Sequence, residues 1–357
     1  MAVLRVMSSI LTINSGSSSV KASLFGADGS RRDFSYGHLR DPASGFDQLM
    51  RDLAGQTPDM VGHRFVHGGD IVDAARVVDA AELERLKGIV NMAPLHLPGN
   101  LLGLQLCSER FDAKQIACFD TAFHATMPEL AKRLPISAAY GLRRYGFHGL
   151  NYAHVASVLP DLLGEQAYGN IIVAHLGSGA SLCLMRELRS QDTTMGYTPA
   201  GGITMGTRSG DLDPGVMVEL AQRYDPIALR DIVFHKMGLL ALSDGESSEM
   251  SDLLSSKSAS ARFAVEYFCR QVSGAIGNLT AKAGGVDALI FTGGIGENAA
   301  SVRAAICQTL GFMDLRLNPV ANEAHTIRLE VDGSKPICIV AADEDHMIYE
   351  LCLKWAK

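Results

Sequence analysis

The sequence is poor in the features that define several common protein classes. It has one Trp and 6% aromatic residues, no CxxC pair among its seven cysteines, and no HExxH spacing. No apolar run reaches the roughly 18 residues that a membrane span needs. An odd, scattered set of cysteines is typical of reduced core thiols in a cytosolic protein, and it argues against disulfides or a zinc site. We therefore expect a cytoplasmic protein without a membrane partner.

Positive charge is also scarce. The chain carries 32 Lys and Arg against 39 Asp and Glu, a formal net charge of −7. Because a general nucleic-acid binder usually has a basic face, we expect no nucleic acid as partner. The Walker signature GxxxxGK[ST] is missing as well, which excludes the P-loop type of nucleotide site. An acidic chain can still bind an anion where a few cations are placed locally.

Glycine, by contrast, is abundant. The 36 glycines make up about 10% of the 357 residues, against a usual share of roughly 7%. They follow no fixed period, which excludes collagen and low-complexity sequence. The 47% hydrophobic content is ample for burial, and a chain of this length usually forms two or three domains.

One pattern occurs twice along the chain: an apolar run, a loop of small residues, and a second apolar run. The first copy is ILTI–NSGSSS–VKASLF from residue 10, and the second is IIVAHL–GSGA–SLCLMREL from residue 171. Aligning Asn14 with His175 brings Gly16 onto Gly177 and Ser17 onto Ser178. The pattern predicts two similar halves, each opening with a hairpin whose turn is suited to hold phosphate.

Short apolar strands alternate with helical segments in the rest of the chain, which predicts the α/β class. A third glycine-rich segment, TGGIGEN, follows the apolar run VDALIF and precedes a helix expected over residues 298–310. Its amides and the helix start offer an anion site. We expect residues 243–260, which are polar and Ser-rich, to form a surface loop. The other predicted elements are strands at 116–119, 171–174, 289–291 and 337–340, and helices at 80–91, 98–111, 214–224, 259–283 and 347–355.

Histidine and arginine gather in short segments flanked by glycine. A lone His in such a setting is more often a hydrogen-bonded core residue than a ligand. As a group, however, these segments offer cations with few carboxylates nearby, which suits a small anion approached closely by backbone. The segments are GHRFVHGG at 62–69, APLHLPGN at 93–100, DTAFHATMP at 120–128, RRYGFHG at 143–149, AHLGSG at 174–179 and TMGTRSGDLDPG at 204–215.

Carboxylates follow three of the predicted strands. Asp120 ends IACFD, Glu297 closes TGGIGE, and the acidic residues 343–345 follow ICIVAA. Residues at the carboxyl ends of strands line the ligand crevice of an α/β fold. Mg²⁺ prefers oxygen ligands and needs only one or two carboxylates, so these residues are candidates for a magnesium site. Asn14, at another strand end, would add an amide oxygen.

Taken in order, these motifs resemble those of the acetokinase (acetate kinase) family, within the superfamily of actin, sugar kinases and heat-shock chaperone ATPases. The resemblance spans Leu11 to Glu350. It implies two similar domains of the duplicated actin-like (ribonuclease H-like) ATPase fold, with a nucleotide cleft between them. The first domain would comprise residues 1–122 and the C-terminal helix 346–357. The second, nucleotide-binding domain would comprise residues 123–345.

The resemblance also implies an activity. It predicts reversible, Mg²⁺-dependent transfer of the ATP γ-phosphoryl group to acetate, giving acetyl phosphate and ADP by direct in-line transfer, with Mn²⁺ as an alternative ion and a homodimer as the assembly. Propionate or butyrate as acceptor is the first alternative. The second is a superfamily ATPase that acts as a conformational switch, although such a protein would not need Arg64, His96 and His148 around a small pocket.

The family pattern assigns roles to individual residues. Asn14 and Glu344 would serve the metal. Arg64 would hold the carboxylate substrate, beside an apolar pocket of Val66, Leu95, Phe147 and Pro199. Asp120, His148 and Arg208 would be catalytic, with His96 beside them. The nucleotide would contact Lys21, His175, Leu176, Gly177, Ser178, Gly179, Glu249, Gly293, Gly294, Ile295, Gly296 and Glu297.

The chemistry of the acceptor narrows the role expected of Asp120, and the sequence departs from the family pattern at three places. A carboxylate acceptor is already ionised at pH 7, so Asp120 is expected to orient Arg64 or a metal-bound water rather than to remove a proton. Ser251 stands where the family pattern has an Arg, with Glu249 near the usual Asp, which puts a nucleotide contact in question. Asp343 replaces an Asn. The stretch from Asn14 to Arg64 is shorter than usual.

Overall fold

The computed structural model describes residues 8–15, 19–37, 39 and 41–356. The chain divides into two compact units. Unit 1 comprises Met1–Ala125, Phe147–His154 and Asp343–Lys357, and unit 2 comprises Thr126–Gly146 and Val155–Ala342. These are packing units. The functional domain limits expected from the sequence, at 122/123 and 345/346, stay a prediction.

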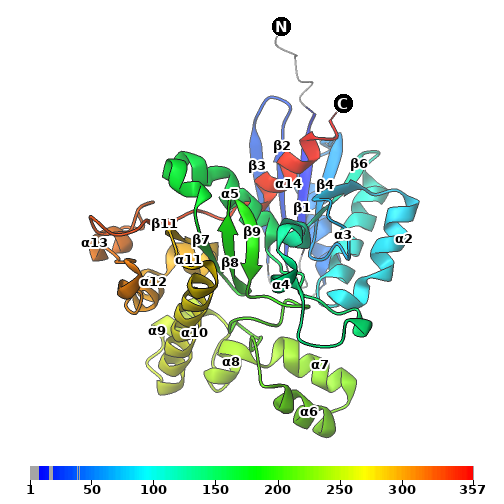
Figure 1. Cartoon of the computed structure of the whole chain (residues 1–357). Helices are drawn as coiled ribbons and strands as arrows, with labels where there is room; N and C mark the ends of the chain where they lie inside the picture. Colours follow the sequence, from blue (N-terminus) through cyan, green and yellow to red (C-terminus); the bar gives the residue numbers. More distant parts are fainter. Residues whose placement is uncertain (1–7, 16–18, 38, 40, 357) are drawn as a thin grey trace. The chain divides into compact units, whose positions relative to one another are not determined.

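Unit 1 is built on a six-stranded mixed sheet in the order β3-β2-β1-β4-β6-β5 (Figure 1). β1 pairs antiparallel with β2, and β2 with β3, while β1, β4 and β6 run parallel to one another. The chain therefore opens with three antiparallel strands, of which the first two form the predicted hairpin. The strands are β1 (Ile10–Ser15), β2 (Val20–Phe25), β3 (Arg31–Tyr36), β4 (Met60–Phe65), β5 (Ala75–Val77) and β6 (Lys114–Phe119).

Helices cover both faces of the unit 1 sheet. Side chains alternate between the two faces along a strand, so Leu11 and Ile13 pack on one side while Ile10 packs on the other. The first side is covered by α1 (Pro42–Asp52) and α3 (Leu97–Arg110). The second is covered by α14 (Glu344–Leu353) and the start of α5 (Gly149–Leu163). Figure 1 shows α14, in red, crossing the strands of this sheet. The short α2 (Ala80–Gly88) completes the unit.

Unit 2 repeats the same strand order. Its five-stranded sheet runs β11-β10-β7-β8-β9, with β7 antiparallel to β8 and parallel to β10. β7 starts and ends at the positions that the alignment of Asn14 with His175 assigns to it, so the prediction of two similar halves is confirmed. The strands are β7 (Ile171–Leu176), β8 (Ala180–Arg186), β9 (Arg189–Thr193), β10 (Ala288–Thr292) and β11 (Ile337–Ile339).

The helices of unit 2 are dominated by α10, which spans Ala259–Ala283 as predicted. α10 begins where the Ser258 hydroxyl accepts from the amide of Ala261, and it ends at Gly284 in a left-handed conformation. The other α-helices are α4 (Glu129–Lys132), α6 (Pro214–Arg223), α7 (Pro226–His235), α8 (Gly238–Leu242), α9 (Met250–Ser255), α11 (Gly293–Asn298), α12 (Ala300–Cys307) and α13 (Pro319–Glu323).

Three local predictions are wrong. The helix expected at 298–310 is shorter, since α12 spans Ala300–Cys307, and the glycine-rich segment before it forms the separate short helix α11, with a non-helical backbone at Ala299 between them. The expected surface loop at 243–260 contains α9, because Met250 and Leu253 are buried and give the segment an apolar side. The C-terminal helix starts at Glu344 rather than at residue 347, since Asp343 caps it by accepting from the amide of His346.

The cysteines lie inside the two units. All seven cysteines are buried and unbonded to one another. Within the described residues, no helix combines the length and the apolar character that a membrane span requires.

Candidate active site

The carboxyl ends of three parallel strands in unit 1 carry polar residues. Asn14 lies at the end of β1, Arg64 at the end of β4, and Asp120 directly after β6. Because β1, β4 and β6 are parallel neighbours, these ends meet at one edge of the sheet. The three side chains are in direct contact there.

Arg64 and Asp120 form the centre of this group. Arg64 donates through Nε and Nη2 to the same oxygen of Asp120, at 3.0 and 2.7 Å. Asp120 has no exposed side-chain surface, and Arg64 is 18% exposed. Burial raises the pKa of Asp120, although the Arg64 charge opposes that shift. Burial also disfavours the Arg64 cation, but the carboxylates of Asp120 and Glu344 outweigh it and raise the pKa of Arg64.

Glu344 joins the group from α14. Its Oε2 accepts from Asn14 Nδ2 at 2.7 Å and lies 3.3 Å from Arg64 Nη1. Arg64 Nη1 also donates to Asn14 Oδ1 at 3.1 Å, which closes a ring of contacts. The neighbouring Asp345 is half-buried, and partial removal from solvent raises its pKa to about 6. The structure therefore brings Asn14, Arg64, Asp120 and Glu344 together, as the family pattern implies.

The donor atoms of this group fit a magnesium ion. Asn14 and Glu344 offer an amide oxygen and a carboxylate, the hard ligands that Mg²⁺ prefers. In the part of the chain that the structure describes, there is no group of three or more His, Cys, Asp or Glu side chains suited to hold a metal. Such a sparse set suits an ion that keeps its waters and shares the oxygens of a phosphate. Lys21 lies directly opposite Asn14 across the first hairpin and is exposed.

Asp120 also fixes the start of α5. Its second oxygen accepts from the amide of Leu150 at 3.3 Å, in the first turn of that helix. Gly149 approaches so closely that a Cβ there would overlap the carbonyl oxygen of Asp120. His148, just before the helix, is buried and has a φ of 59°, a strained value for a residue with a side chain. The strained backbone places His148 next to the Asp120 contact, and its catalytic role stays a prediction.

The predicted acyl-pocket residues are distributed over both units. Val66 and Phe147 are buried in unit 1, where Leu95 and His96 precede α3, and Pro199 is buried in unit 2. The sequence analysis missed Asn100 in this region. Its Oδ1 accepts from the amide of Val66 at 3.2 Å, and its Nδ2 donates to the carbonyl of Ser15 at 2.9 Å. A buried Asn on the apolar side of a helix was the signal that could have identified it.

In unit 2, the predicted phosphate turn lies between β7 and β8. His175 is buried near the end of β7, and Gly177 donates its amide to the carbonyl of Gly179 at 3.1 Å. The carbonyl of Ser178 accepts from the amide of Gly206 at 3.2 Å. This bond connects the turn to the segment that carries Arg208.

Arg208 is held in a tight backbone loop. Its Nη1 donates to the carbonyl of Pro199 at 2.6 Å, and burial lowers its pKa to about 10. Gly238, at the start of α8, packs against the backbone of this loop, where an added Cβ would lie 2.8 Å from the nitrogen of Arg208. An arginine that is half-buried and forms no ion pair with a carboxylate among the described residues is well suited to meet an anionic ligand.

The predicted nucleoside loop follows β10 and forms α11. Glu297 Oε1 accepts from the amides of Gly293 and Ala342, at 2.8 and 2.9 Å, so the loop is closed by its own glutamate. Arg303, which follows TGGIGEN and was given no role from the sequence, is fully buried. It donates to the carbonyls of Gly296 and Glu297 at 2.9 and 2.8 Å. These contacts hold both ends of the loop, with Gly294 and Ile295 between them.

The departure at residues 249–251 falls in α9. Glu249 is exposed and stands at the N-cap position of this short helix, where its side chain makes no capping hydrogen bond, and its amide donates to the Ser247 hydroxyl at 3.0 Å. Ser251 is exposed on the same helix. The local fold accommodates both residues, and the nucleotide role of Glu249 stays a prediction.

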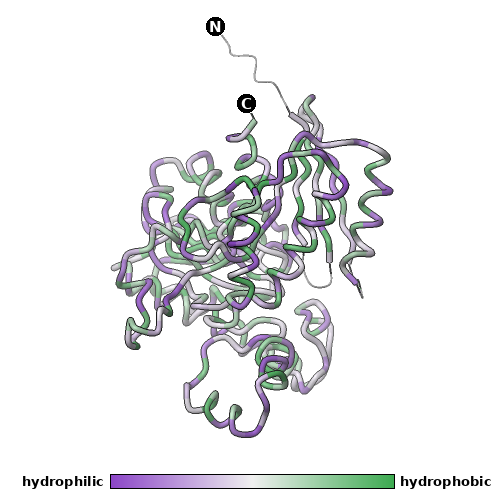
Figure 2. Tube along the Cα trace, turned by 90° about the vertical axis from the view of Figure 1, so that its right-hand side faces the viewer, coloured by the Kyte–Doolittle hydropathy of each residue, from purple (hydrophilic) through white to green (hydrophobic). Residues whose placement is uncertain are grey.

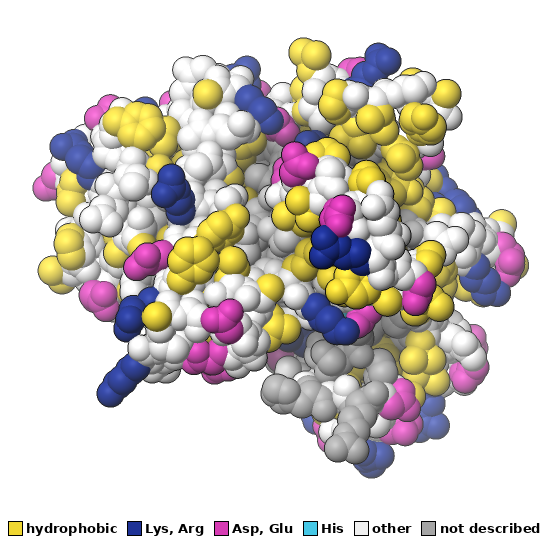
Figure 3. All heavy atoms as spheres, turned by 90° about the horizontal axis from the view of Figure 1, so that it is seen from below, with side chains coloured by type: hydrophobic (Ala, Val, Ile, Leu, Met, Phe, Trp, Pro, Cys, Tyr) yellow, Lys and Arg dark blue, Asp and Glu magenta, His cyan; other side chains and the backbone are white. Residues whose placement is uncertain are grey.

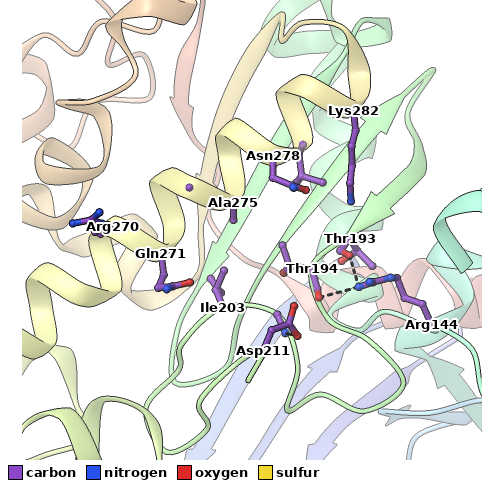
Figure 4. A pocket seen from close by; sticks show the side chains of 13 residues that line it. Arg144, Thr193, Thr194, Ile203, Asp211, Arg270, Gln271, Ala275, Asn278 and Lys282 are labelled. Atoms are coloured by element: carbon purple, nitrogen blue, oxygen red, sulfur yellow. Dashed lines mark hydrogen bonds between the residues drawn. The ribbon is translucent and has the colours of Figure 1, made fainter. Parts of the chain in front are cut away.

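A cavity of about 450 Å³ in unit 2 lies away from all of these residues (Figure 4). It is lined by α10 and by the segment that follows β9. On one side, Arg144 Nη1 donates to the carbonyls of Thr193 and Thr194, both at 3.0 Å. None of the predicted site residues lines this cavity.

The repeated sheet order and the residues at the strand ends define an α/β protein of the duplicated actin-like ATPase fold. A family model described as the acetokinase family matches residues 46–350. An acetate kinase from Nitrobacter hamburgensis is 38% identical, covering 96% of this chain and 95% of its own length. The chain therefore belongs to the acetokinase family, and the resemblance noted in the sequence is confirmed.

Other relatives include kinases named for two acyl acceptors. A propionate kinase from Citrobacter rodentium is 40% identical over 81% of this chain and 74% of its own length. Among solved structures, a propionate kinase from Francisella tularensis has a TM-score of 0.88 at 29% identity, covering 97% of this chain and 99% of its own. The acetate kinase of Porphyromonas gingivalis has a TM-score of 0.83 at 28% identity, covering 98% and 100%.

Proposed function

We propose that this protein catalyses the reversible, Mg²⁺-dependent transfer of the ATP γ-phosphoryl group to acetate. The observation that carries the proposal is the contact group of Asn14, Arg64, Asp120 and Glu344 at one sheet edge, in a chain of the acetokinase family. Phosphoryl transfer depends on positioning and charge neutralisation, with little covalent work for the protein. A buried arginine beside oxygen ligands for a metal supplies both requirements.

In unit 1, each residue takes one task. Arg64 binds the carboxylate of acetate, and Asp120 orients Arg64 through the two bonds to one oxygen. Asn14 and Glu344 hold Mg²⁺ through its ligands or its waters, with Mn²⁺ as a substitute ion. When bound, the ion neutralises charge on the phosphate oxygens. Val66, Leu95 and Phe147 give the acyl pocket its apolar surface, and His96 and His148 donate toward the transferring group.

In unit 2, the turn from His175 to Gly179 and the loop from Gly293 to Glu297 contact ATP. Backbone amides freed of side chains approach phosphate closely, which is why glycine is favoured at such positions. Arg208 neutralises charge that develops on the phosphoryl group in the transition state. The bond from Gly206 to Ser178 fixes Arg208 relative to the phosphate turn.

The acyl acceptor is acetate, with propionate as the second candidate because some relatives carry that name. An apolar pocket discriminates one methylene by only about 1–3 kcal/mol, so some activity with propionate is expected. The test is a hydroxamate assay for acyl phosphate with ATP, Mg²⁺ and acetate, propionate or butyrate in turn. A higher kcat/KM for propionate or butyrate would contradict the choice of acetate. ATP hydrolysis that is independent of any carboxylate would contradict a kinase altogether.

The assembly is a homodimer in the cytoplasm. One surface that supports a self-association is formed by α6 and α7, neither of which has a buried residue. Val218 is 60% exposed and Ile227 is 83% exposed. Apolar stretches colour the helices at the bottom of Figure 2, and hydrophobic side chains lie among charged ones on the face in Figure 3. Light scattering on the purified protein and on Ile227→Asp would test this surface, since a monomeric wild-type protein contradicts the dimer.

A further inference from the structure

Three consecutive acidic residues open α14, and each has its own partner in unit 1. Asp345 accepts from the Thr12 hydroxyl on β1 at 2.8 Å. Glu344 contacts Asn14 and Arg64, as described above. Asp343 pairs with Arg31 on β3, outside the group of predicted site residues. The contact between Asp343 and Arg31 has no role among the predicted functions of the site residues.

The Arg31 contact has the geometry of a strong ion pair. Nη1 and Nη2 donate to the two different oxygens of Asp343, at 2.5 and 3.0 Å. Nε donates to Asp33 at 2.8 Å, and Asp33 also accepts from the Ser23 hydroxyl. The guanidinium carbon lies 5.1 Å from the centre of the Phe25 ring. Surface ion pairs contribute little on average, but a two-point arginine contact within a network is the exception.

Asp343 links Arg31 to Glu344, the carboxylate proposed to hold the metal, because it caps the helix on which Glu344 lies. It caps α14 through Oδ1, which accepts from the amide of His346 at 3.0 Å. Glu344 is the first residue of that helix. The rotation of Asp343 therefore sets the direction in which the helix starts, and with it the direction of Glu344. Phe25 also stacks on Tyr349 of α14 at 4.3 Å, so β2 and β3 support the helix from the same side.

We propose that Arg31 is a positioning residue for Glu344. Through its two-point contact it fixes the cap of α14, and through its charge it balances Asp343, so that Asp343 adds no net negative charge beside Glu344. This inference rests on the proposed function, which gives Glu344 its metal role. The proposal also relates Arg31 to the Asp at position 343, where the family pattern has an Asn. An Asp that caps the helix beside the metal site needs a cation to balance its charge, whereas a neutral Asn does not.

The test compares four variants with the wild-type enzyme. They are Arg31→Ala, Arg31→Lys, Asp343→Asn, and the double variant of Arg31→Ala with Asp343→Asn. The readouts are the free Mg²⁺ concentration for half-maximal activity, KM for acetate, and binding of Mn²⁺ in the presence of ADP, followed by electron paramagnetic resonance. Binding of Mn²⁺ is independent of turnover, so it reports on the metal site even if the substrate has been misassigned.

We expect Arg31→Ala to raise the half-maximal Mg²⁺ concentration and to weaken Mn²⁺ binding about tenfold, the usual effect of losing a group that orients a metal ligand. KM for acetate stays within about twofold, because Arg64 is held by Asp120. Arg31→Lys should lose less Mn²⁺ affinity than Arg31→Ala, since it keeps the positive charge but not the two-point contact of the guanidinium with Asp343. The double variant recovers most of the lost affinity, because Asn caps the helix and needs no balancing cation.

Arg32→Ala is the matched control. Arg32 is the next residue of β3 and points to the opposite face, where it donates to the carbonyl of Asp52 and lies over Phe34. Equal Mn²⁺ binding in Arg31→Ala and Arg32→Ala would overturn the proposal, and so would tighter Mn²⁺ binding in Arg31→Ala than in the wild-type enzyme. It would also be overturned if the fold-changes in Mn²⁺ affinity of Arg31→Ala and Asp343→Asn multiplied in the double variant, because the two side chains would then act independently. If Arg31→Ala does not fold, Arg31→Lys and Asp343→Asn provide the same comparison. If the wild-type enzyme has no acyl kinase activity but the variants change Mn²⁺ binding as expected, the proposed function is refuted and the positioning role of Arg31 is retained.

Discussion

Arg64 places two N–H groups on one oxygen of Asp120, and Asp120 uses its other oxygen to hold the amide of Leu150. The carboxylate is thus shared between a cation on β4 and the start of α5. This relationship explains how a carboxylate can be fully buried here, since the Arg64 cation opposes the rise in the pKa of Asp120 that burial causes. It also means that one carboxylate determines both the direction of the guanidinium and the position of the helix that follows His148.

The Arg64–Asp120 pair gives the first prediction. Arg64→Ala leaves a buried carboxylate without its cation, so it should lower the free energy of unfolding by about 3–5 kcal/mol. Adding Asp120→Asn should recover most of that stability, although neither variant should keep normal KM for acetate. Urea unfolding of the two single variants and the double variant measures the effect. Additive losses in the double variant would show that the two side chains do not depend on each other.

Arg208 gives the second prediction. If it neutralises charge at the transferring phosphoryl group, Arg208→Ala should lower kcat by about 10³–10⁵ with little change in either KM. Arg223→Ala is the control, because Arg223 forms an exposed pair with Glu219 on α6. Steady-state kinetics separates the two parameters. A near-normal kcat for Arg208→Ala would refute the assigned role.

Gly149 gives the third prediction. A Cβ at this position would overlap the carbonyl oxygen of Asp120, so Gly149→Ala should displace the start of α5 and lower stability by about 1–3 kcal/mol, with a loss of kcat. Gly277→Ala in α10 meets no atom within 4 Å and should be neutral or raise stability by about 0.5–1 kcal/mol. Thermal unfolding measures the stability of both variants. Equal changes in stability would contradict the close approach at Gly149.

His63 gives a prediction for pH. It is buried and lies directly before Arg64 on β4. Its Nε2 lies 2.7 Å from Gln115 Oε1, and its Nδ1 has no hydrogen-bond partner among the described residues. Burial lowers its pKa to about 4, against 6.5 in the unfolded chain. The unfolded state therefore binds a proton first, so the contribution of His63 is full above pH 6.5 and is lost as the pH falls toward 4.

At pH 5, this difference should remove about 2 kcal/mol from the free energy of unfolding relative to pH 7. A His63→Gln variant lacks the titrating ring, so its stability should fall less over the same interval. Urea denaturation at pH 5, 6 and 7 makes the comparison. If the wild-type and variant curves stay parallel, another group causes the acid sensitivity.

The sequence predicted the fold well wherever the pattern was local. The two hairpins, the 25-residue α10 and the buried strand β10 each follow from apolar period and turn residues within a short window. The failures at 243–260 and 298–310 have one cause. Met250 and Leu253 are buried only because α9 packs on other parts of unit 2, and Ala299 breaks a helix that its neighbours favour locally. Tertiary contacts outweighed local propensity at both places.

The candidate site divides in the same way. Motif order was enough to select Asn14, Arg64, Asp120 and Glu344, although these residues are separated by up to 330 positions. Arg31 was missed because no motif surrounds it, whereas Asn100 ends APLHLPGN and Arg303 follows TGGIGEN, but the residue letters alone give neither of them a role. Their importance comes from what they touch across the fold, and a side-chain contact between distant strands leaves no periodic signal in the sequence.

The sequence by itself determined the family, the duplicated strand order and the identity of the chemical groups, because these depend on residue types at fixed spacing. Only the tertiary structure decided which partner each group takes. Asp120 is paired with Arg64, Glu344 with Asn14, and Asp343 with Arg31, since parallel strands bring their carboxyl ends to one edge and α14 begins there. Charge balance among buried groups is a property of that packing, so it could not be derived from the net charge of −7.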